Sequence, residues 1–167
     1  MKKQIPQVIQ DLNAFLDGKG YLGVVSEVQL PAIVQETVET KGGVGAKYAT
    51  GAISAMEATL KLNILDANTY LSFGLNTFEN RIPIILKGSI YDDGNSKPLV
   101  VVFTADIESI TPSAFKAGEV IEQEIKLQVQ FYSLTIGDIP VVVIDSRNMI
   151  CMIGGVDYLG DLRSNLQ

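Results

Sequence analysis

The sequence contains no histidine, no tryptophan and only one cysteine, Cys151, among its 167 residues. Without histidine, a Ser-His-Asp or Cys-His catalytic system cannot form, and the most common zinc ligand is missing. A single cysteine cannot make a disulfide within the chain, so folding requires no oxidising compartment. Catalysis would have to rely on carboxylates, lysine or tyrosine, and we expect no catalytic, metal-binding or cofactor-binding residues.

Long hydrophobic runs are also missing, although 47% of the residues are hydrophobic. No apolar run approaches the ~20 residues that span a bilayer, and Pro6, Gln7 and Gln10 interrupt any signal sequence near the start. We therefore expect synthesis in a cytoplasm and no membrane anchor. The formal net charge is −6, which disfavours tight DNA binding because such binding requires clustered lysine and arginine.

The clearest pattern in the sequence runs from residue 119 to residue 135, where apolar and polar residues alternate. Alternation with a period of two predicts a β-strand with one apolar and one polar face. At ~3.3 Å per residue, such a strand would span on the order of 55 Å. It would be much longer than the strands of ~3–10 residues that are usual in compact domains. It must either bend or reach beyond its own core, and the second option points to sheets that extend across subunits.

The rest of the chain predicts a single, mainly β domain over residues 1–167, either a sandwich or a barrel. Residues 53–65 alternate like the long strand, and residues 81–91 and 99–110 predict a hairpin. A short helix should start after Asp66 as N-cap and stop at Gly74, and a C-terminal helix should carry an apolar stripe. That stripe consists of Val156, Leu159, Leu162 and Leu166. Residues 41–51 are rich in glycine and predict a flexible loop.

Several short motifs suggest ligand sites but lack the required context. Residues 18–23 read G-x-G-x-x-G, yet they precede a β-rich run instead of opening a helix after a strand. Residues 42–47 resemble a phosphate loop only faintly, because Ala46 separates the last glycine from the lysine. Residues 92–95 lack the spaced acids of a calcium loop and predict a turn.

Glu122 and Glu124 lie on one face of the predicted strand, roughly 7 Å apart. This separation overlaps with that of the paired carboxylates in an inverting glycosidase. We favour a solvated sheet face, because nothing nearby distinguishes one carboxylate as the acid and the other as the base. A β-sandwich carbohydrate-active or carbohydrate-binding module is the alternative of a different class. Sugar sites usually present aromatic platforms, and only 7% of these residues are aromatic.

Segments spread in order over nearly the whole chain resemble a known family. They include Asn13-x-Phe15-x-Asp17-Gly18, Phe73-Gly74-Leu75, Phe115-Lys116-x-Gly118-Glu119, Ile136-Gly137-Asp138, Ile144-Asp145-x-x-Asn148-Met149 and Gly155-Val156-Asp157. The chain resembles the FII family of major tail tube proteins, which form the inner tube of contractile phage tails and of R-type pyocins. The resemblance implies a β-sandwich or small barrel with a flanking helix.

The same resemblance implies a structural, non-enzymatic role in hexameric rings that stack head to tail. The genome would pass along the lumen during ejection, without specific DNA binding. The implied partners are further copies of the chain, the tail sheath protein, baseplate and tail terminator proteins, and a tape measure protein inside the tube. The protein would be made in the host cytoplasm and end in the virion tail. The inner tube of a phage-tail-like bacteriocin or of a secretion-type injection device is the related alternative.

Two sets of residues follow as candidate functional sites. The polar faces of the two alternating strands are expected to line the lumen, where a neutral or acidic wall lets DNA slide without sticking. The lumen candidates are Glu57, Thr59, Lys61, Asn63, Glu122, Glu124, Lys126, Gln128 and Gln130. The glycine-rich segment is expected to order against a neighbouring subunit or ring, because ordering it alone is costly. Its candidates are Gly42, Gly43, Gly45 and Lys47.

Overall fold

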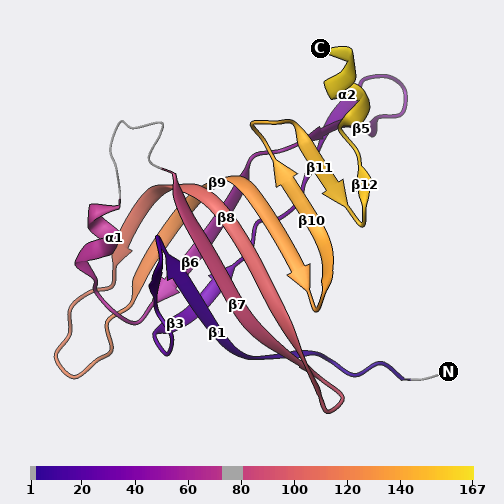
Figure 1. The fold of residues 1–167 in the computed structure, drawn as a ribbon. Helices are drawn as coiled ribbons and strands as arrows, with labels where there is room; N and C mark the ends of the chain where they lie inside the picture. The colour runs from indigo at the N-terminus through magenta and orange to yellow at the C-terminus, as the bar shows by residue number, and fades with distance from the viewer. Residues whose placement is uncertain (1–2, 73–80) are drawn as a thin grey trace.

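The computed structural model describes residues 3–72 and 81–167, which form a mainly β domain with two short helices (Figure 1). The strands are β1 (Val8–Leu16), β2 (Lys19–Gly20), β3 (Val25–Gln29), β4 (Gln35–Thr40), β5 (Ala46–Ile53), β6 (Met56–Leu62), β7 (Ile82–Asp92), β8 (Asn95–Pro112), β9 (Gln123–Ile136), β10 (Ile139–Asp145), β11 (Ile150–Ile153) and β12 (Val156–Asp157). The helices are α1 (Ala67–Leu71) and α2 (Gly160–Asn165).

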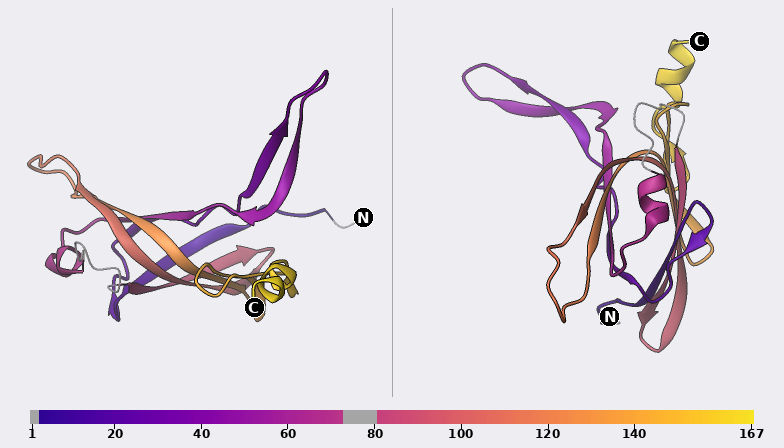
Figure 2. Two further views of the ribbon diagram at one scale, coloured as in Figure 1. Left: turned by 90° about the horizontal axis from the view of Figure 1, so that it is seen from above. Right: turned by 90° about the vertical axis from the view of Figure 1, so that its left-hand side faces the viewer.

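Ten of these strands belong to one sheet that folds over on itself (Figure 2). Its main path runs β12-β11-β10-β9-β8-β7-β1-β2, while β6 pairs with the first half of β9 and β3 pairs with β6. The long strands β8 and β9 therefore belong to both layers. All neighbours pair antiparallel, and the core lies between the two layers.

The core is formed by one face of each alternating strand. In β6, the side chains of Met56, Ala58, Leu60 and Leu62 are buried, and those between them point outward. In β9, Ile125, Leu127 and Val129 are buried in the same way. This confirms the predicted alternation of both strands.

The long strand is shorter at its start than the sequence predicts, and it bends. It begins at Gln123 and has 14 residues, so residues 119–122 belong to the preceding loop. Register shifts between β8 and β9 occur at Thr104/Ala105 and at Ile107/Ser109. Such bulges bend a strand and increase its twist. The chain thus resolves the excess length by bending one strand through both layers.

The glycine-rich segment is not the long loop that its composition predicts. Residues 46–53 form β5, which pairs with β4 from Gln35↔Ile53 to Thr40↔Ala46 and leaves only residues 41–45 as a turn. Backbone pairing with β4 outweighs the low strand propensity of the glycine and alanine residues in this stretch. The resulting hairpin projects away from the body of the domain (Figure 2).

The remaining predictions differ from the structure mainly in where helices and strands begin and end. Asp66 is the N-cap of α1, as predicted, whereas the predicted stop at Gly74 lies outside the described residues. The β7–β8 hairpin is also confirmed, and its turn consists of Asp93 and Gly94, both with positive φ, as a type I′ turn requires. The C-terminal helix starts only at Gly160, because Val156 pairs with Ile153 in β12.

Candidate functional site

The outward side of the layer β3-β6-β9-β8 carries most of the polar residues that the sequence analysis singled out. Pairing of β6 with β9 places Glu57 opposite Gln128, Thr59 opposite Lys126, and Lys61 opposite Glu124. Residues directly opposite each other in a ladder share a face. We call this surface the polar face; it consists of Glu27, Gln29, Glu57, Thr59, Lys61, Asp106, Glu108, Ser109, Thr111, Glu124, Lys126, Gln128 and Gln130.

The contributions of β3 and β8 to the polar face were not predicted from the sequence. They become visible only in the pairing register, which sets Glu27 opposite Lys61 and Asp106 opposite Gln128. The Lys61 ammonium and the Glu27 carboxylate form an ion pair at 3.3 Å. The hydrogen bond from Lys61 to Glu27 is the largest cause of a raised pKa of Lys61, and the carboxylates of Glu122 and Glu124 add to it.

Side-chain amides connect the carboxylates of the polar face. Gln128 Nε2 donates to Glu57 Oε1 at 3.2 Å and to Glu108 Oε2 at 2.8 Å. Gln130 Nε2 donates to Asp106 Oδ2 at 2.9 Å. Across the face, carboxylates outnumber lysines, so the surface is acidic. The carboxylates are Glu27, Glu57, Asp106, Glu108 and Glu124, and the lysines are Lys61 and Lys126.

Two predicted lumen residues lie just beyond the strands. Asn63 follows β6, is exposed, and donates its backbone N–H to the Val24 carbonyl at 2.7 Å. Glu122 precedes β9, and its backbone N–H donates to Ser113 Oγ at 3.1 Å. Glu122 therefore lies just outside β9, although its carboxylate, like that of Glu124, contributes to the raised pKa of Lys61.

The layer that bears the polar face has two edges that are open within the described residues. β3 pairs only with β6 there, and β8 pairs with β7 only as far as Ala105, opposite Ile82. The second half of β8, from Asp106 to Pro112, thus has β9 on one side and no described strand on the other. Open edges present unpaired N–H and C=O groups that can accept another strand.

Asp66 is the centre of a polar cluster next to α1. Its carboxylate accepts hydrogen bonds from Lys19 Nζ and Tyr21 Oη, both at 2.7 Å, and from the Asn68 backbone N–H at 3.2 Å. The hydrogen bonds from Lys19 and then Tyr21 lower the pKa of Asp66 to about 2. Burial, followed by the bond to Asp66, raises the pKa of Tyr21 to about 12. The carboxyl stays ionised and the phenol neutral near pH 7, which suits a structural anchor.

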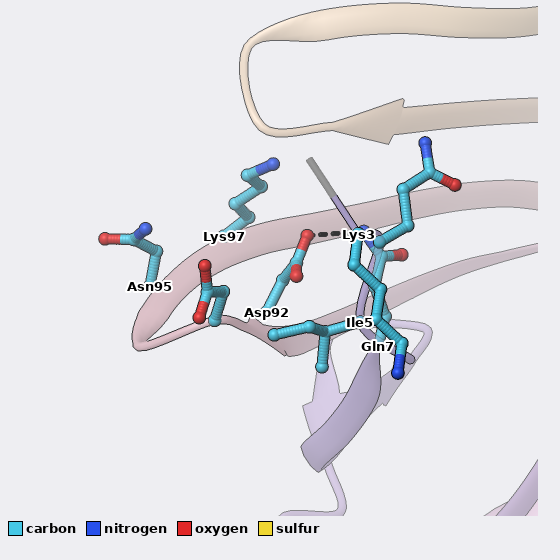
Figure 3. Close-up of a pocket in the computed structure, with 8 residues that line it drawn as sticks. Lys3, Ile5, Gln7, Asp92, Asn95 and Lys97 are labelled. Atoms are coloured by element: carbon cyan, nitrogen blue, oxygen red, sulfur yellow. Dashed lines mark hydrogen bonds between the residues drawn. The ribbon is translucent and has the colours of Figure 1, made fainter. Parts of the chain in front are cut away.

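Two further features that could take part in chemistry are a surface hollow and the single cysteine. A hollow of about 710 Å³ between the N-terminal segment and the β7–β8 turn is lined by Lys3, Asp92 and Lys97, among others (Figure 3). Gln7 Nε2 donates to Asp92 Oδ2 there at 3.1 Å. Cys151 is fully buried, and burial raises the pKa of its thiol. Residues 3–72 and 81–167 contain no group of acidic or cysteine side chains placed to hold a metal ion.

The sequence profile of the family described as Phage tail tube protein FII matches residues 6–166. The chain belongs to this family of tail tube proteins. Its family is structural, and its role is that of a tail tube subunit.

Individual relatives agree with this membership. The tail tube protein of Escherichia phage P2 is 27% identical over 177 residues, which cover 97% of this chain and 98% of the relative. A chain in the PVC sheath/tube terminator of an extracellular contractile injection system shows the same fold, with a TM-score of 0.56 and 19% identity over 80% of this chain and 98% of the other. A chain in the anti-feeding prophage tube-terminating cap superposes with a TM-score of 0.59 and 18% identity, over 81% and 94%.

In this tube protein, the predicted contact residues of the glycine-rich segment lie at the tip of the β4–β5 hairpin. Gly42, Gly43 and Gly45 belong to the turn and Lys47 to the start of β5. Every residue of β4 is exposed, and Val44 at the tip is 88% exposed. None of the helices in the described residues has the length and hydropathy of a membrane span.

Proposed function

We propose that this chain forms hexameric rings that stack into the inner tube of a contractile phage tail, through whose lumen the genome passes. The observation that carries the proposal is a four-stranded layer, β3-β6-β9-β8, with both edges open in the described residues and a polar, acidic outer face. A subunit with two open edges can pair on both sides. A ring of such subunits leaves no edge free.

The ring closes when the β3 edge of one copy pairs with the second half of β8 of the next. Closing the combined sheet into a barrel turns one face of every copy inward. The other face of this layer is packed into the subunit core through side chains such as Leu60 and Leu127. Only the polar face is therefore available to line the lumen, together with Asn63 and Glu122 at its border.

An acidic wall suits a passage for DNA. Lysine and arginine bind phosphates by releasing counterions, whereas an excess of carboxylates repels the DNA backbone and leaves the DNA mobile.

The proposed role is structural, without catalysis, cofactor or metal. Outside the ring, the partners are a sheath protein, baseplate and terminator proteins, and a tape measure protein in the lumen. Synthesis takes place in the host cytoplasm, and the final location is the virion tail.

A tube of the same construction also serves a bacteriocin or a secretion-type injection device. The fold shared with the PVC sheath–tube complex, at a TM-score of 0.56 and 19% identity, favours this second candidate as a close variant. The subunit geometry is common to both. Capsid and terminase genes beside the gene for this chain identify the phage version, and their absence identifies the device without DNA.

Electron microscopy of the purified protein tests the proposed function. At high protein concentration we expect hollow rings and tubes of uniform width. In a reconstruction of the tube, the side chains of Lys126 and Gln128 should face the lumen. A protein that stays a single subunit at every concentration, in micrographs and in light scattering, would contradict the proposal, as would a tube whose lumen is lined by another face.

The β4–β5 hairpin provides a second prediction. An isolated two-stranded hairpin is marginally stable at best, and Val38 and Tyr48, which pair across it, are 55% and 61% exposed. We propose that the hairpin docks on a neighbouring subunit or ring. Its amides should exchange rapidly in the free subunit and be protected in the tube. The amides of the buried strand β9 should be protected in both states and serve as the reference. Equal protection of the hairpin amides in the free subunit and in the tube would refute this docking.

A further inference from the structure

The loop between β8 and β9, residues 113–122, is ordered and yet exposes large apolar side chains. The Ser113 N–H donates to the Glu122 carbonyl at 2.7 Å, and the Glu119 N–H donates to the Lys116 carbonyl at 3.3 Å. Gly118 supplies the positive φ of +83° that this tight turn requires. On this preformed loop, Phe115 is 71% and Val120 is 76% exposed. Exposed apolar groups on a rigid projection are typical of contact sites.

A second apolar feature lies beside the C-terminal helix. A groove of about 420 Å³, which we call the α2 groove, runs between the base of β5, the end of β10 and α2. Apolar side chains such as Ile53, Met56, Ile144 and Leu159 make up most of its lining, and Ser54, Gln128, Gln130, Asp145 and Ser146 supply the polar part, so one side of the groove borders the polar face. Leu162 is 46% exposed at its rim. Within the described part of the chain, α2 lies along one side of this groove and nothing fills it.

The β8–β9 loop and the α2 groove lie at opposite ends of the layer that bears the polar face. The loop follows Pro112, which pairs with Gln123, whereas the groove begins at Met56, which pairs with Val129. These two positions on β9 are six residues apart, or roughly 20 Å by strand rise. Figures 1 and 2 both show the β8–β9 loop and α2 at opposite ends of the molecule.

We propose that Phe115 and Val120 of one copy insert into the α2 groove of a copy in the adjacent ring. The inference rests on the proposed tube and names the side chains that stack its rings. A projection at one end and a matching groove at the other form a heterologous, head-to-tail contact, which repeats along an axis instead of closing on itself. Both halves are present in every copy, so the occupant is a second copy of this chain. The docked loop would also bring Lys116, beside Phe115, toward the acidic Asp145 in the groove lining, whose carboxylate accepts hydrogen bonds from Arg147 and Asn148 of its own chain.

Cysteine cross-linking tests the contact while leaving Phe115 and Val120 in place. The variant Ala114→Cys/Ser146→Cys carries one thiol on the exposed loop and one in the groove lining, and the native Cys151 is fully buried. Treatment of assembled tubes with a short bis-maleimide should give a ladder of linked chains that continues far beyond six. A ladder that stops at six would place the contact within a ring and overturn the inference. Tubes without cross-links would overturn it too.

Two controls separate this inference from the proposed function. In Ala114→Cys/Asn95→Cys the second thiol lies at the β7–β8 turn, and its tubes should give no ladder. Phe115→Ser should form single rings that do not stack, whereas Tyr91→Ser, which removes another exposed aromatic side chain, should form tubes like the unmodified chain. Tubes of Phe115→Ser in normal yield would refute the inference alone. Failure of the unmodified chain to form rings would refute both.

Discussion

Replacing Phe103 with alanine is expected to lower the free energy of unfolding of the subunit by about 3–5 kcal/mol. Phe103 is 1% exposed and stacks on Tyr132, with ring centroids 5.5 Å apart and an interplanar angle of 20°. It sits immediately before the Thr104/Ala105 register shift, where β8 passes from one layer to the other. Truncation leaves a cavity at the junction of the layers, where the surrounding strands cannot collapse without losing their pairing.

Urea denaturation of the unassembled subunit measures this loss, and the chain offers a matched control. Phe115→Ala removes the same atoms from a side chain that is 71% exposed, so its stability should stay within about 0.5 kcal/mol. Typical domains have about 5–15 kcal/mol in total, so the Phe103→Ala subunit should also unfold at a clearly lower temperature. Equal unfolding midpoints for the two variants would show that the core does not depend on this junction.

The parts of the fold that the sequence predicted are those specified by local pattern. Residues 56–62 and 123–130 alternate because one face is buried and the other is wet, and a one-residue slip would reverse both. Asp66 predicted the start of α1 because its side chain satisfies a free N–H of the first turn. The turn at Asp93-Gly94 could be predicted because few residue types adopt positive φ at two successive positions.

The parts that the sequence did not predict depend on pairing between distant segments. β1 carries Gln10, Asp11 and Asn13 and buries only Ala14 and Leu16, so it has almost no periodic signal. It exists because its backbone pairs with β7. β5 is a strand for the same reason, since its partner β4 supplies the hydrogen bonds that a stretch with three alanines and Gly51 does not specify by itself.

The candidate site shows the same division. Its residues on β6 and β9 were predicted from alternation, whereas Glu27, Asp106 and Glu108 belong to it only through the register of β3 and β8. Gln123 is a further departure from local pattern. It is fully buried on the apolar side of β9, with no hydrogen-bond partner for its amide among the described residues. Periodicity alone would have assigned that position to an apolar side chain.

Replacing carboxylates of the polar face with lysines should make the lumen of the tube bind DNA instead of letting it pass. In Glu57→Lys/Glu108→Lys, two exposed carboxylates on either side of Gln128 become ammonium groups, repeated in every copy around the lumen. Lysines that meet successive phosphates release counterions, and binding then falls steeply with salt. Tubes of this variant should co-sediment with short duplex DNA in dilute salt. Their affinity for DNA should fall on the order of 10³-fold or more when the salt concentration rises fourfold.

The matched control is Asp92→Lys/Asp93→Lys, which changes the net charge of the chain by the same amount at the β7–β8 turn, away from the polar face. Tubes of the control and of the unmodified chain should leave DNA in the supernatant, with intact tubes verified by electron microscopy. Because net charge is equal in the two variants, only the position of the lysines can separate them. Equal DNA retention by both variants would mean that the polar face does not line the lumen, whatever the tube looks like from outside.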